Sequence, residues 1–189
     1  MATTTQQSTE LINGIDVGAL KDTIRAVKAD PAKGKTSWKV KTHWKGGTRS
    51  DTKVDGYTIG GEFVPQDFTL QIDEPHALLG HNEFANPQEY LLAAMNACMM
   101  ATYVGAASMM GVKLDHLEIE TTGDIDLRGF LGIDPNVAAG YEKLHYTVRV
   151  SGNGTPEQYQ KVHEAVMATS PNYFNMNRAI AIDADLIVE

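Results

Sequence analysis

The segment that surrounds the only cysteine constrains the fold of this chain most. It reads NPQEYLLAAMNACMMATYVGAASMMGV over residues 86–112. Asn86 can cap a helix, Pro87 suits the first helical position, and Glu89 completes a capping box three residues after the cap. Gly111 is suited to end the helix. Because the interior of the segment is apolar nearly all round, the pattern predicts a long helix buried in the middle of the fold.

The same segment is about as long as a membrane span, which is the alternative interpretation. Asn96 interrupts the apolar run of residues 91–110, and the many alanines make this run only weakly hydrophobic. The net charge of −8 disfavours an anionic membrane surface and nucleic acid, because both attract basic proteins. The sequence therefore predicts a soluble protein that binds no membrane and no nucleic acid.

Cysteine usage and the N-terminal residues indicate the compartment. One cysteine excludes an intrachain disulfide and a zinc site built from several cysteines. A single thiol fits a reducing compartment, so we expect a cytoplasmic location. Residues 1–10, MATTTQQSTE, lack the basic and apolar regions of a signal peptide and predict a short disordered tail. Residues 11–189 are expected to form a single domain.

The other elements are predicted from periodicity and capping signals. Apolar residues at helical spacing indicate a helix over residues 17–29, and Thr155, Pro156 and Gln158 open another with a capping box. Strands are predicted at residues 36–44, 54–72, 117–128, 143–152 and 180–188, and SPNYFN at 170–175 predicts a turn. This order predicts an α+β fold with a mostly antiparallel sheet packed on the long buried helix.

Three of the predicted strands have distinctive patterns. In residues 36–44, TSWKVKTHW, alternation places Trp38 and Trp44 on one side and predicts a half-buried strand. In residues 54–72, Asp55–Gly56 and Gly60–Gly61 are expected to turn the chain between short strands. The last strand is expected to place alternate apolar residues on one face, namely Ile180, Ile182, Ala184, Leu186 and Val188.

Cys98 is the candidate nucleophile, although a free cysteine is more often a small apolar core residue. It lies about three turns past the helix N-terminus, beyond the reach of the helix dipole. A reactive thiol there needs a cation or hydrogen-bond donors from elsewhere in the protein. No Lys or Arg occurs between Val54 and Val112. Arg49 and Arg128 are the leading candidates, because a guanidinium keeps its charge when buried.

The polar segment DEPHALLGHNE, residues 73–83, has residue types that can bind a metal. Its carboxylates lie close to His76 and His81 in sequence, but the spacing matches no helical histidine pair. We therefore expect a polar loop with one histidine near the pocket, and neither a metal nor another cofactor. Met95 and Met99 are core residues or, as the alternative, line a pocket for apolar ligands.

NPQEYLLAAMNAC, residues 86–98, resembles the signature of the OsmC/Ohr family of osmotically inducible and organic hydroperoxide resistance proteins. The order of elements agrees with that family from Trp38 to Glu189. The resemblance implies an OsmC-like fold in an intertwined homodimer with two sites at the interface. It implies that Cys98 is the peroxidatic cysteine, and that Arg49 from the N-terminal hairpin holds its thiolate. The substrate pocket is then expected to be formed by Met95, Met99, Thr102, His81 and Ser170.

Two departures from the family pattern concern the chemistry. Gln88 stands ten residues before the cysteine, where the family has a glutamate that pairs with the arginine, and Glu89 is the adjacent carboxylate. Ser170–Pro171 stands where the family's reductases have a resolving cysteine followed by proline. Because Ser170 cannot form a disulfide, a two-cysteine cycle is not available to this chain.

Two functions of different classes follow from the resemblance and the departures. The first is protection against oxidative stress by reduction of organic hydroperoxides at Cys98, in a one-cysteine mechanism with an external thiol or dithiol reductant. The alternative is a non-catalytic protein that binds a small apolar ligand at the dimer interface, with Cys98 in the pocket wall. A weaker option, thiol-based hydrolysis, needs His76 or His81 as a base beside Cys98.

Overall fold

The protein is described by a computed structural model in which residues 11–188 are placed. The predicted tail, residues 1–10, lies outside these described residues. The chain divides into two compact units, the first ending at Leu91 and the second beginning at Leu92. The expectation of one domain over residues 11–189 stays a prediction.

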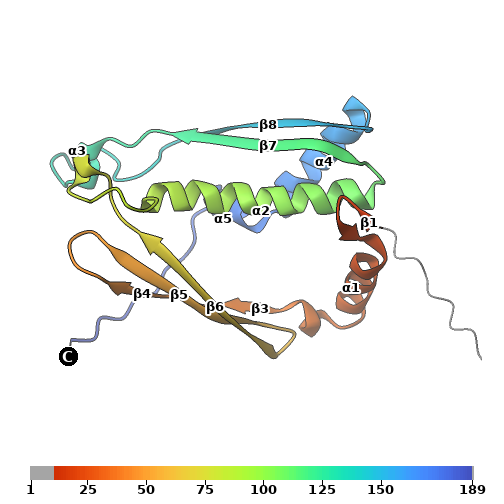
Figure 1. The fold of residues 1–189 in the computed structure, drawn as a ribbon, viewed down its shortest axis with the longest axis horizontal. Helices are drawn as coiled ribbons and strands as arrows, with labels where there is room; N and C mark the ends of the chain where they lie inside the picture. Colours follow the sequence, from red (N-terminus) through yellow and green to blue (C-terminus); the bar gives the residue numbers. More distant parts are fainter. Residues whose placement is uncertain (1–10, 189) are drawn as a thin grey trace, which may run out of the picture. The chain divides into compact units, whose positions relative to one another are not determined.

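The first unit contains an antiparallel sheet built on one long hairpin (Figure 1). In this hairpin, β5 (Ser50–Ile59) pairs with β6 (Glu62–Ile72), and the chain turns at Gly60–Gly61 as predicted. On β5, β3 (Thr36–Trp38) and β4 (Lys41–Trp44) pair with successive stretches of the strand. The other elements are β1 (Leu11–Ile12), β2 (Ile15–Asp16), α1 (Val17–Ala29), and the short 3₁₀ helices η1 (Pro31–Gly34) and η2 (His76–Leu78). The predicted helix over residues 17–29 is confirmed.

Two predictions for this sheet are wrong. Asp55–Gly56 does not turn the chain, because β5 continues through it with a register shift between Val54 and Gly56. A Cβ on Gly56 would lie 2.4 Å from the carbonyl oxygen of Val64, so glycine is needed for the bulge and not for a turn. Residues 36–44 form two short strands that are exposed rather than half-buried. Trp38 is 69% exposed and Trp44 is 77% exposed.

The helix that carries the cysteine forms as predicted. It is α2 (Pro87–Met109), which begins in the first unit and continues through the second. The backbone N–H of Asn86 donates to Glu89 Oε2 at 2.7 Å, and the Glu89 N–H donates to Asn86 Oδ1 at 2.9 Å, which confirms the capping box. After the helix, Gly111 adopts a positive φ of 71°, as expected for a terminating glycine.

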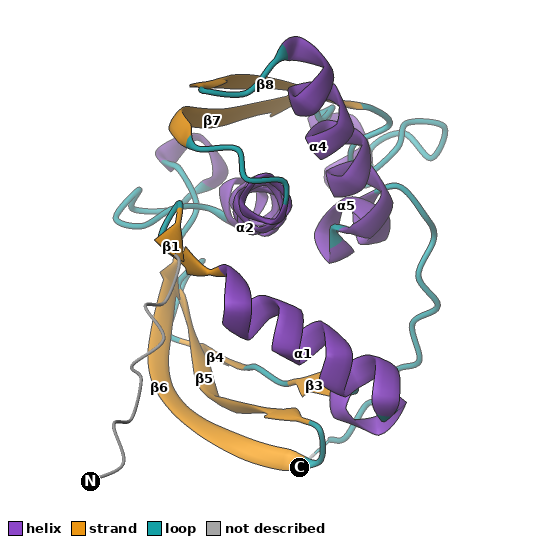
Figure 2. Cartoon of the chain, turned by 90° about the vertical axis from the view of Figure 1, so that its right-hand side faces the viewer, coloured by secondary structure: helices purple, strands orange, loops and turns teal. Residues whose placement is uncertain are grey.

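The second unit packs α2 against a two-stranded sheet and a further helix (Figure 2). An antiparallel ladder joins β7 (Leu114–Gly123) to β8 (Leu144–Gly152), and α4 (Pro156–Thr169) lies beside α2. The predicted capping box between Thr155 and Gln158 is present at the start of α4. Between β7 and β8 lies the short helix α3 (Leu127–Phe130).

One face of α2 supplies the core of the second unit. Met95, Met99, Tyr103 and Ala107 recur every four residues and are buried, because this spacing keeps them on the same side of a helix. They pack in one cluster with Val112, Ile119, Val162 and Val166. Other residues of α2, such as Ala94 and Ala97, are exposed, so the predicted burial on all sides is wrong for a single chain. By length and composition alone α2 could cross a membrane, which is weak evidence because core helices also meet this criterion.

The C-terminal segment differs most from its prediction. SPNYFN is a short helix, α5 (Pro171–Met176), rather than a turn. Residues 180–188 form no strand, although their apolar residues alternate. Ile182, Leu186 and Val188 are each at least 85% exposed. A strand requires a neighbour that completes its hydrogen bonds, and none of the described strands pairs with this segment.

Candidate thiol site

Cys98 is half-buried on α2, and two neutral groups donate hydrogen bonds to its sulfur. The Ser170 hydroxyl and the backbone N–H of Asn172 each lie 3.5 Å from Cys98 Sγ. Both donors come from the junction of α4 and α5, far along the sequence from the cysteine. The sulfur is therefore held in place by donors from outside its own helix, as the position of Cys98 required.

The geometry of the junction explains how these donors reach the sulfur. Ser170 caps the C-terminus of α4 by donating its backbone N–H to the carbonyl oxygen of Val166. The Asn172 side-chain amide donates to the carbonyl oxygen of Ala94 at 2.9 Å, which ties α5 to α2 one turn before Cys98. Ser170 is fully buried, so its hydroxyl has little freedom to bond elsewhere. The structure thus brings Ser170 to the cysteine, while sequence reasoning missed Asn172, whose contribution is a backbone group.

Arg49 is held by different partners than expected. Its Nη1 lies 3.1 Å from Glu83 Oε2, and its Cζ lies 5.4 Å from the centre of the Phe84 ring. Glu83 takes the ion pair with Arg49 and Glu89 caps its own helix, and the pairing of Arg49 with Gln88 or Glu89 stays a prediction. Arg49 belongs to the first unit and Cys98 to the second, so contact between guanidinium and sulfur stays a prediction.

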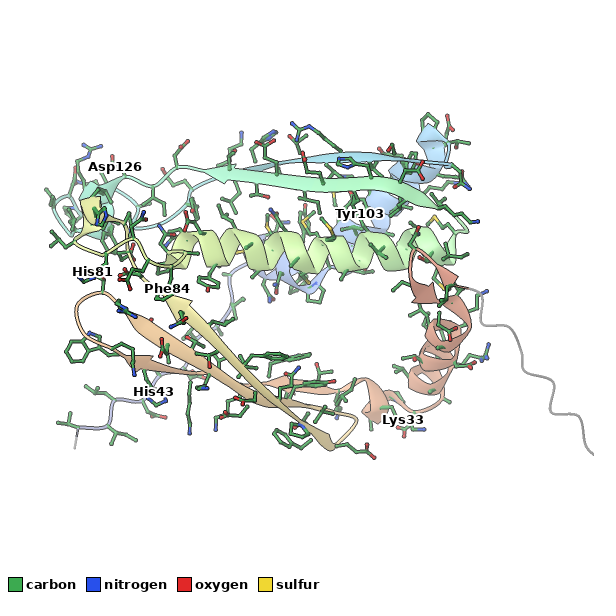
Figure 3. The ribbon with its side chains drawn as sticks, in the orientation of Figure 1. Lys33, His43, His81, Phe84, Tyr103 and Asp126 are labelled. Carbon is green, nitrogen blue, oxygen red and sulfur yellow. The ribbon has the colours of Figure 1, made fainter. Side chains whose placement is uncertain are left out.

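The loop between β6 and α2 carries Glu83 and Phe84 (Figure 3). A buried aspartate in this loop organises its backbone. Asp73 is inaccessible to solvent and accepts hydrogen bonds from the Thr48 hydroxyl and from the backbone N–H groups of Glu74, His81 and Glu83. Burial by itself would raise the pKa of Asp73. The four donors outweigh burial and lower this pKa to about 2. Asp73 is therefore a carboxylate at neutral pH and fixes the fold of this loop.

The two histidines of the same loop take no part in a metal cluster. His76 Nδ1 lies 3.0 Å from the carbonyl oxygen of Gly80. His81 is exposed, and its backbone N–H donates a hydrogen bond to Asp73 Oδ2. Within residues 11–188, no group of three or more His, Cys, Asp or Glu side chains could hold a metal ion. A Cβ on Gly80 would lie 1.8 Å from the Glu74 carbonyl oxygen, so the tight loop requires glycine at this position.

The remaining candidate residues, Arg128, Thr102, Met99 and Met95, contact groups other than the cysteine sulfur. Arg128 is committed to Asp126 in its own turn, with Nε 3.0 Å from Asp126 Oδ2. The Thr102 hydroxyl donates to the Cys98 carbonyl oxygen at 2.9 Å and so contacts the backbone rather than the sulfur. Met99 is fully buried in the core. Met95, in contrast, lines a cavity of about 310 Å³ together with residues of β8 and α5.

Comparison with known proteins places the chain in a family. Residues 80–185, more than half of the chain, match the family described as OsmC-like protein. The chain therefore belongs to the OsmC-like family. A comparison with curated proteins finds no match.

Solved structures confirm the predicted OsmC-like α+β fold. An OsmC-like protein from Mycoplasma pneumoniae has a TM-score of 0.59 at 12% identity, covering 75% of this chain and 87% of that chain. An OsmC-like protein of unknown function from Vibrio cholerae has a TM-score of 0.53 at 15% identity, covering 73% of this chain and 92% of that chain. At these identities the likeness establishes the fold alone.

Proposed function

We propose that this protein protects against oxidative stress by reducing organic hydroperoxides at Cys98 with a one-cysteine mechanism. The observation that carries the proposal is the pair of hydrogen bonds to Cys98 Sγ from the Ser170 hydroxyl and the Asn172 N–H. These bonds fix the sulfur beside the start of α5, and a nucleophile held in a defined position reacts faster than a mobile one. Membership of the OsmC-like family supports the same role.

The proposed peroxidase reaction has three steps. The Cys98 thiolate attacks one peroxide oxygen, the O–O bond breaks, and the leaving alkoxide takes a proton to become an alcohol. The sulfur is thereby oxidised to a sulfenic acid. An external thiol then displaces the hydroxyl as water and forms a mixed disulfide, and a second thiol group releases Cys98 as the thiol. An external reductant is required because Ser170, the residue beside the sulfur, cannot form a disulfide.

Arg49 is the proposed cation for this chemistry. A guanidinium stabilises both the thiolate and the negative charge that develops on the leaving oxygen. Glu83 and Phe84 fix the orientation of Arg49, and its side chain remains 37% exposed, so part of the guanidinium is free to meet another group. In this proposal Glu83 takes the positioning role that the family resemblance assigns to a residue ten positions before the cysteine.

We further propose that the protein acts as a homodimer. The single chain exposes large apolar side chains on the sheet of the first unit, including Trp38, Trp44 and Phe63, and along the C-terminal residues 180–188. Exposed apolar surface of this extent is typical of an obligate interface. Sedimentation equilibrium checks this proposal, and a monomer at micromolar concentration would contradict it.

Peroxidase assays with matched variants test the proposed reaction. Consumption of cumene hydroperoxide and of hydrogen peroxide is followed with dihydrolipoamide as reductant, in the wild type, Cys98→Ser, Arg49→Ala and Arg25→Ala. Arg25 is a control because it is exposed on α1 and pairs with Asp22. We expect turnover of the organic peroxide that is lost in Cys98→Ser, falls at least tenfold in Arg49→Ala, and persists in Arg25→Ala. Turnover at the Cys98→Ser level in the wild type would refute the peroxidase proposal.

The alternative function is a binding protein in which Cys98 is a wall residue. One observation favours it: both groups that donate to the sulfur are neutral, and neutral donors stabilise a thiolate less than a cation does. The rate of alkylation of Cys98 by iodoacetamide as a function of pH separates the two functions. Full reactivity at neutral pH supports the peroxidase, whereas reactivity that appears only in alkaline solution supports the binding protein.

A further inference from the structure

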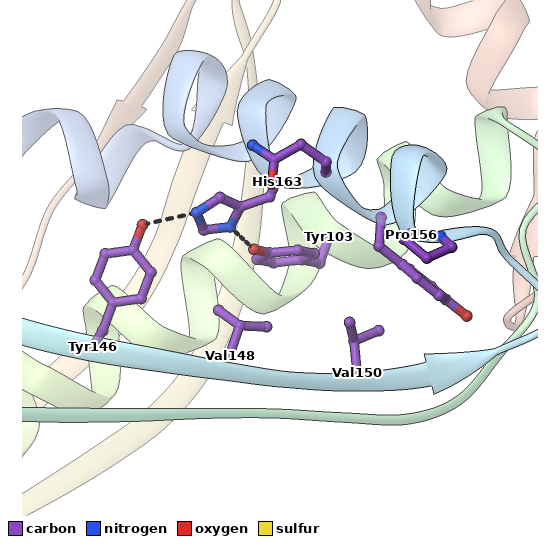
Figure 4. Close-up of a pocket in the computed structure, with 8 residues that line it drawn as sticks. Tyr103, Tyr146, Val148, Val150, Pro156 and His163 are labelled. Carbon is purple, nitrogen blue, oxygen red and sulfur yellow. Dashed lines mark hydrogen bonds between the residues drawn. The ribbon is translucent and has the colours of Figure 1, made fainter.

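A second group of polar side chains lies on another face of α2, away from the thiol (Figure 4). His163 of α4 is bonded at both ring nitrogens, by the hydroxyl of Tyr103 at Nδ1 and by that of Tyr146 at Nε2, the latter at 3.4 Å. Tyr103 follows Cys98 by five residues, which places the two side chains about 140° apart around the helix axis. The histidine and its two tyrosines are therefore separate from the thiol site.

These three side chains line a cavity of about 460 Å³ in the second unit. Val148 and Val150 of β8 and Pro156 of α4 form its apolar wall. Half of the lining residues carry aromatic rings, since Tyr159 joins the two tyrosines and the histidine. Among the described residues that line it, there is no Lys, Arg, Asp or Glu. The cavity therefore combines aromatic walls with a few convergent polar groups, as ligand sites do.

The hydrogen bonds around His163 leave one donor free. A neutral imidazole has one N–H and one acceptor nitrogen, so one tyrosine accepts from the ring while the other donates to it. The tyrosine that accepts keeps its own O–H available. In the tautomer that carries its N–H at Nε2, Tyr103 donates to Nδ1 and Tyr146 is the tyrosine that accepts. Tyr146 is half-buried, whereas Tyr103 is only 2% exposed, so in this tautomer the O–H of Tyr146 is a donor that a ligand can reach. Burial raises the pKa of both tyrosines, which keeps their hydroxyls protonated at neutral pH.

We propose that this cavity binds an uncharged aromatic molecule whose carbonyl or hydroxyl oxygen accepts a hydrogen bond from Tyr146. The ring of the ligand packs against Val150 and Pro156 and meets the tyrosine rings edge to face. A charged ligand is disfavoured, because the lining offers no opposite charge to compensate for its loss of water. This site is independent of the proposed peroxidase activity, because it includes no atom of Cys98.

Acetophenone and benzoate serve as probes, because they share an aromatic ring and differ in charge. Each is titrated into the full-length protein at neutral pH and followed by the NMR resonances of the His163 ring. We expect saturable binding of acetophenone at concentrations below roughly 10 mM and at least tenfold weaker binding of benzoate. Absence of saturable acetophenone binding, or tighter binding of benzoate, would overturn the proposal.

Four variants locate the binding. Tyr146→Phe should weaken acetophenone binding by about tenfold, because one hydrogen bond is lost. Val150→Trp should abolish binding by filling the cavity. Tyr173→Phe is the matched control, because this ring meets Tyr146 edge to face at 6.2 Å but does not line the cavity. Cys98→Ser should also bind as the wild type. Wild-type affinity in Tyr146→Phe, which keeps its ring and its packing, would contradict the assignment even if Val150→Trp failed to fold.

Discussion

Replacement of Ser170 by cysteine tests the geometry of the thiol site most directly. The Ser170 hydroxyl oxygen lies 3.5 Å from Cys98 Sγ. A disulfide has an S–S distance of about 2.0 Å, so side-chain rotations and a small shift of the backbone are enough to join two sulfurs at these positions. We expect Ser170→Cys to form an intrachain disulfide after one equivalent of cumene hydroperoxide. In this reaction the Cys98 sulfenic acid is attacked by the new thiol and water is released.

The disulfide should also stabilise the protein by a measurable amount. Cys98 and Ser170 are 72 positions apart in the sequence. Closure of a loop of this length removes conformational entropy from the unfolded chain and stabilises the folded state by about 4 kcal/mol. With a typical urea m-value of about 2 kcal/mol/M, the unfolding midpoint should rise by about 2 M in the oxidised variant.

Mass spectrometry after alkylation without reduction identifies the link, and urea unfolding of the oxidised and reduced forms measures its effect. Thr169→Cys is the matched control, because Thr169 is the adjacent residue and its hydroxyl donates to the Ala165 carbonyl oxygen instead. Equal cross-linking in Thr169→Cys, purely interchain links in Ser170→Cys, or an unchanged urea midpoint would refute the placement of Ser170 beside the sulfur.

Three further predictions concern the stability of the fold. Because the pKa of Asp73 is lowered from 3.8 to about 2 on folding, its contribution is complete above about pH 4 and is lost as the pH falls toward 2. Urea unfolding of Asp73→Asn should lack this pH dependence, and a wild-type profile in the variant would contradict it. Met99→Ala should lower the free energy of unfolding by about 3 kcal/mol, because Met99 is fully buried. Met109→Ala should lower it by less than about 0.5 kcal/mol, because Met109 is exposed, and similar losses in the two variants would contradict the assignment of the core. Glu89→Ala should cost about 1 kcal/mol by loss of the capping box and Gln88→Ala much less, and equal thermal melts would exclude the cap.

Local signals were sufficient for the three long helices, α1, α2 and α4. The capping boxes at Asn86 and at Thr155 are formed between residues three positions apart, so their partners are visible in the sequence itself. The same holds for the turn at Gly60–Gly61, where glycine is required for positive φ. Asp55–Gly56 misled the prediction because a glycine permits a bulge as readily as a turn.

The candidate site was only partly predictable. Cys98 was singled out because it is the only cysteine, and Ser170 because its position matches a family motif. The ion pair of Arg49 with Glu83 was not predictable, because it depends on where the loop between β6 and α2 places Glu83. No local pattern predicts the bonds of His163 to Tyr103 and Tyr146, because these tyrosines lie 60 and 17 positions away in the sequence.

The cysteine helix, its caps, the helix over residues 17–29 and the family resemblance could all be predicted from the sequence, because each depends on residues close together in the chain. The packing of distant elements settles which face of α2 is buried and which donors meet the sulfur, and it leaves residues 180–188 without a partner among the described strands. The physical reason is that alternation and helical periodicity reveal which side of an element is apolar. The surface that covers that side is supplied by elements distant in sequence, whose placement no local pattern encodes.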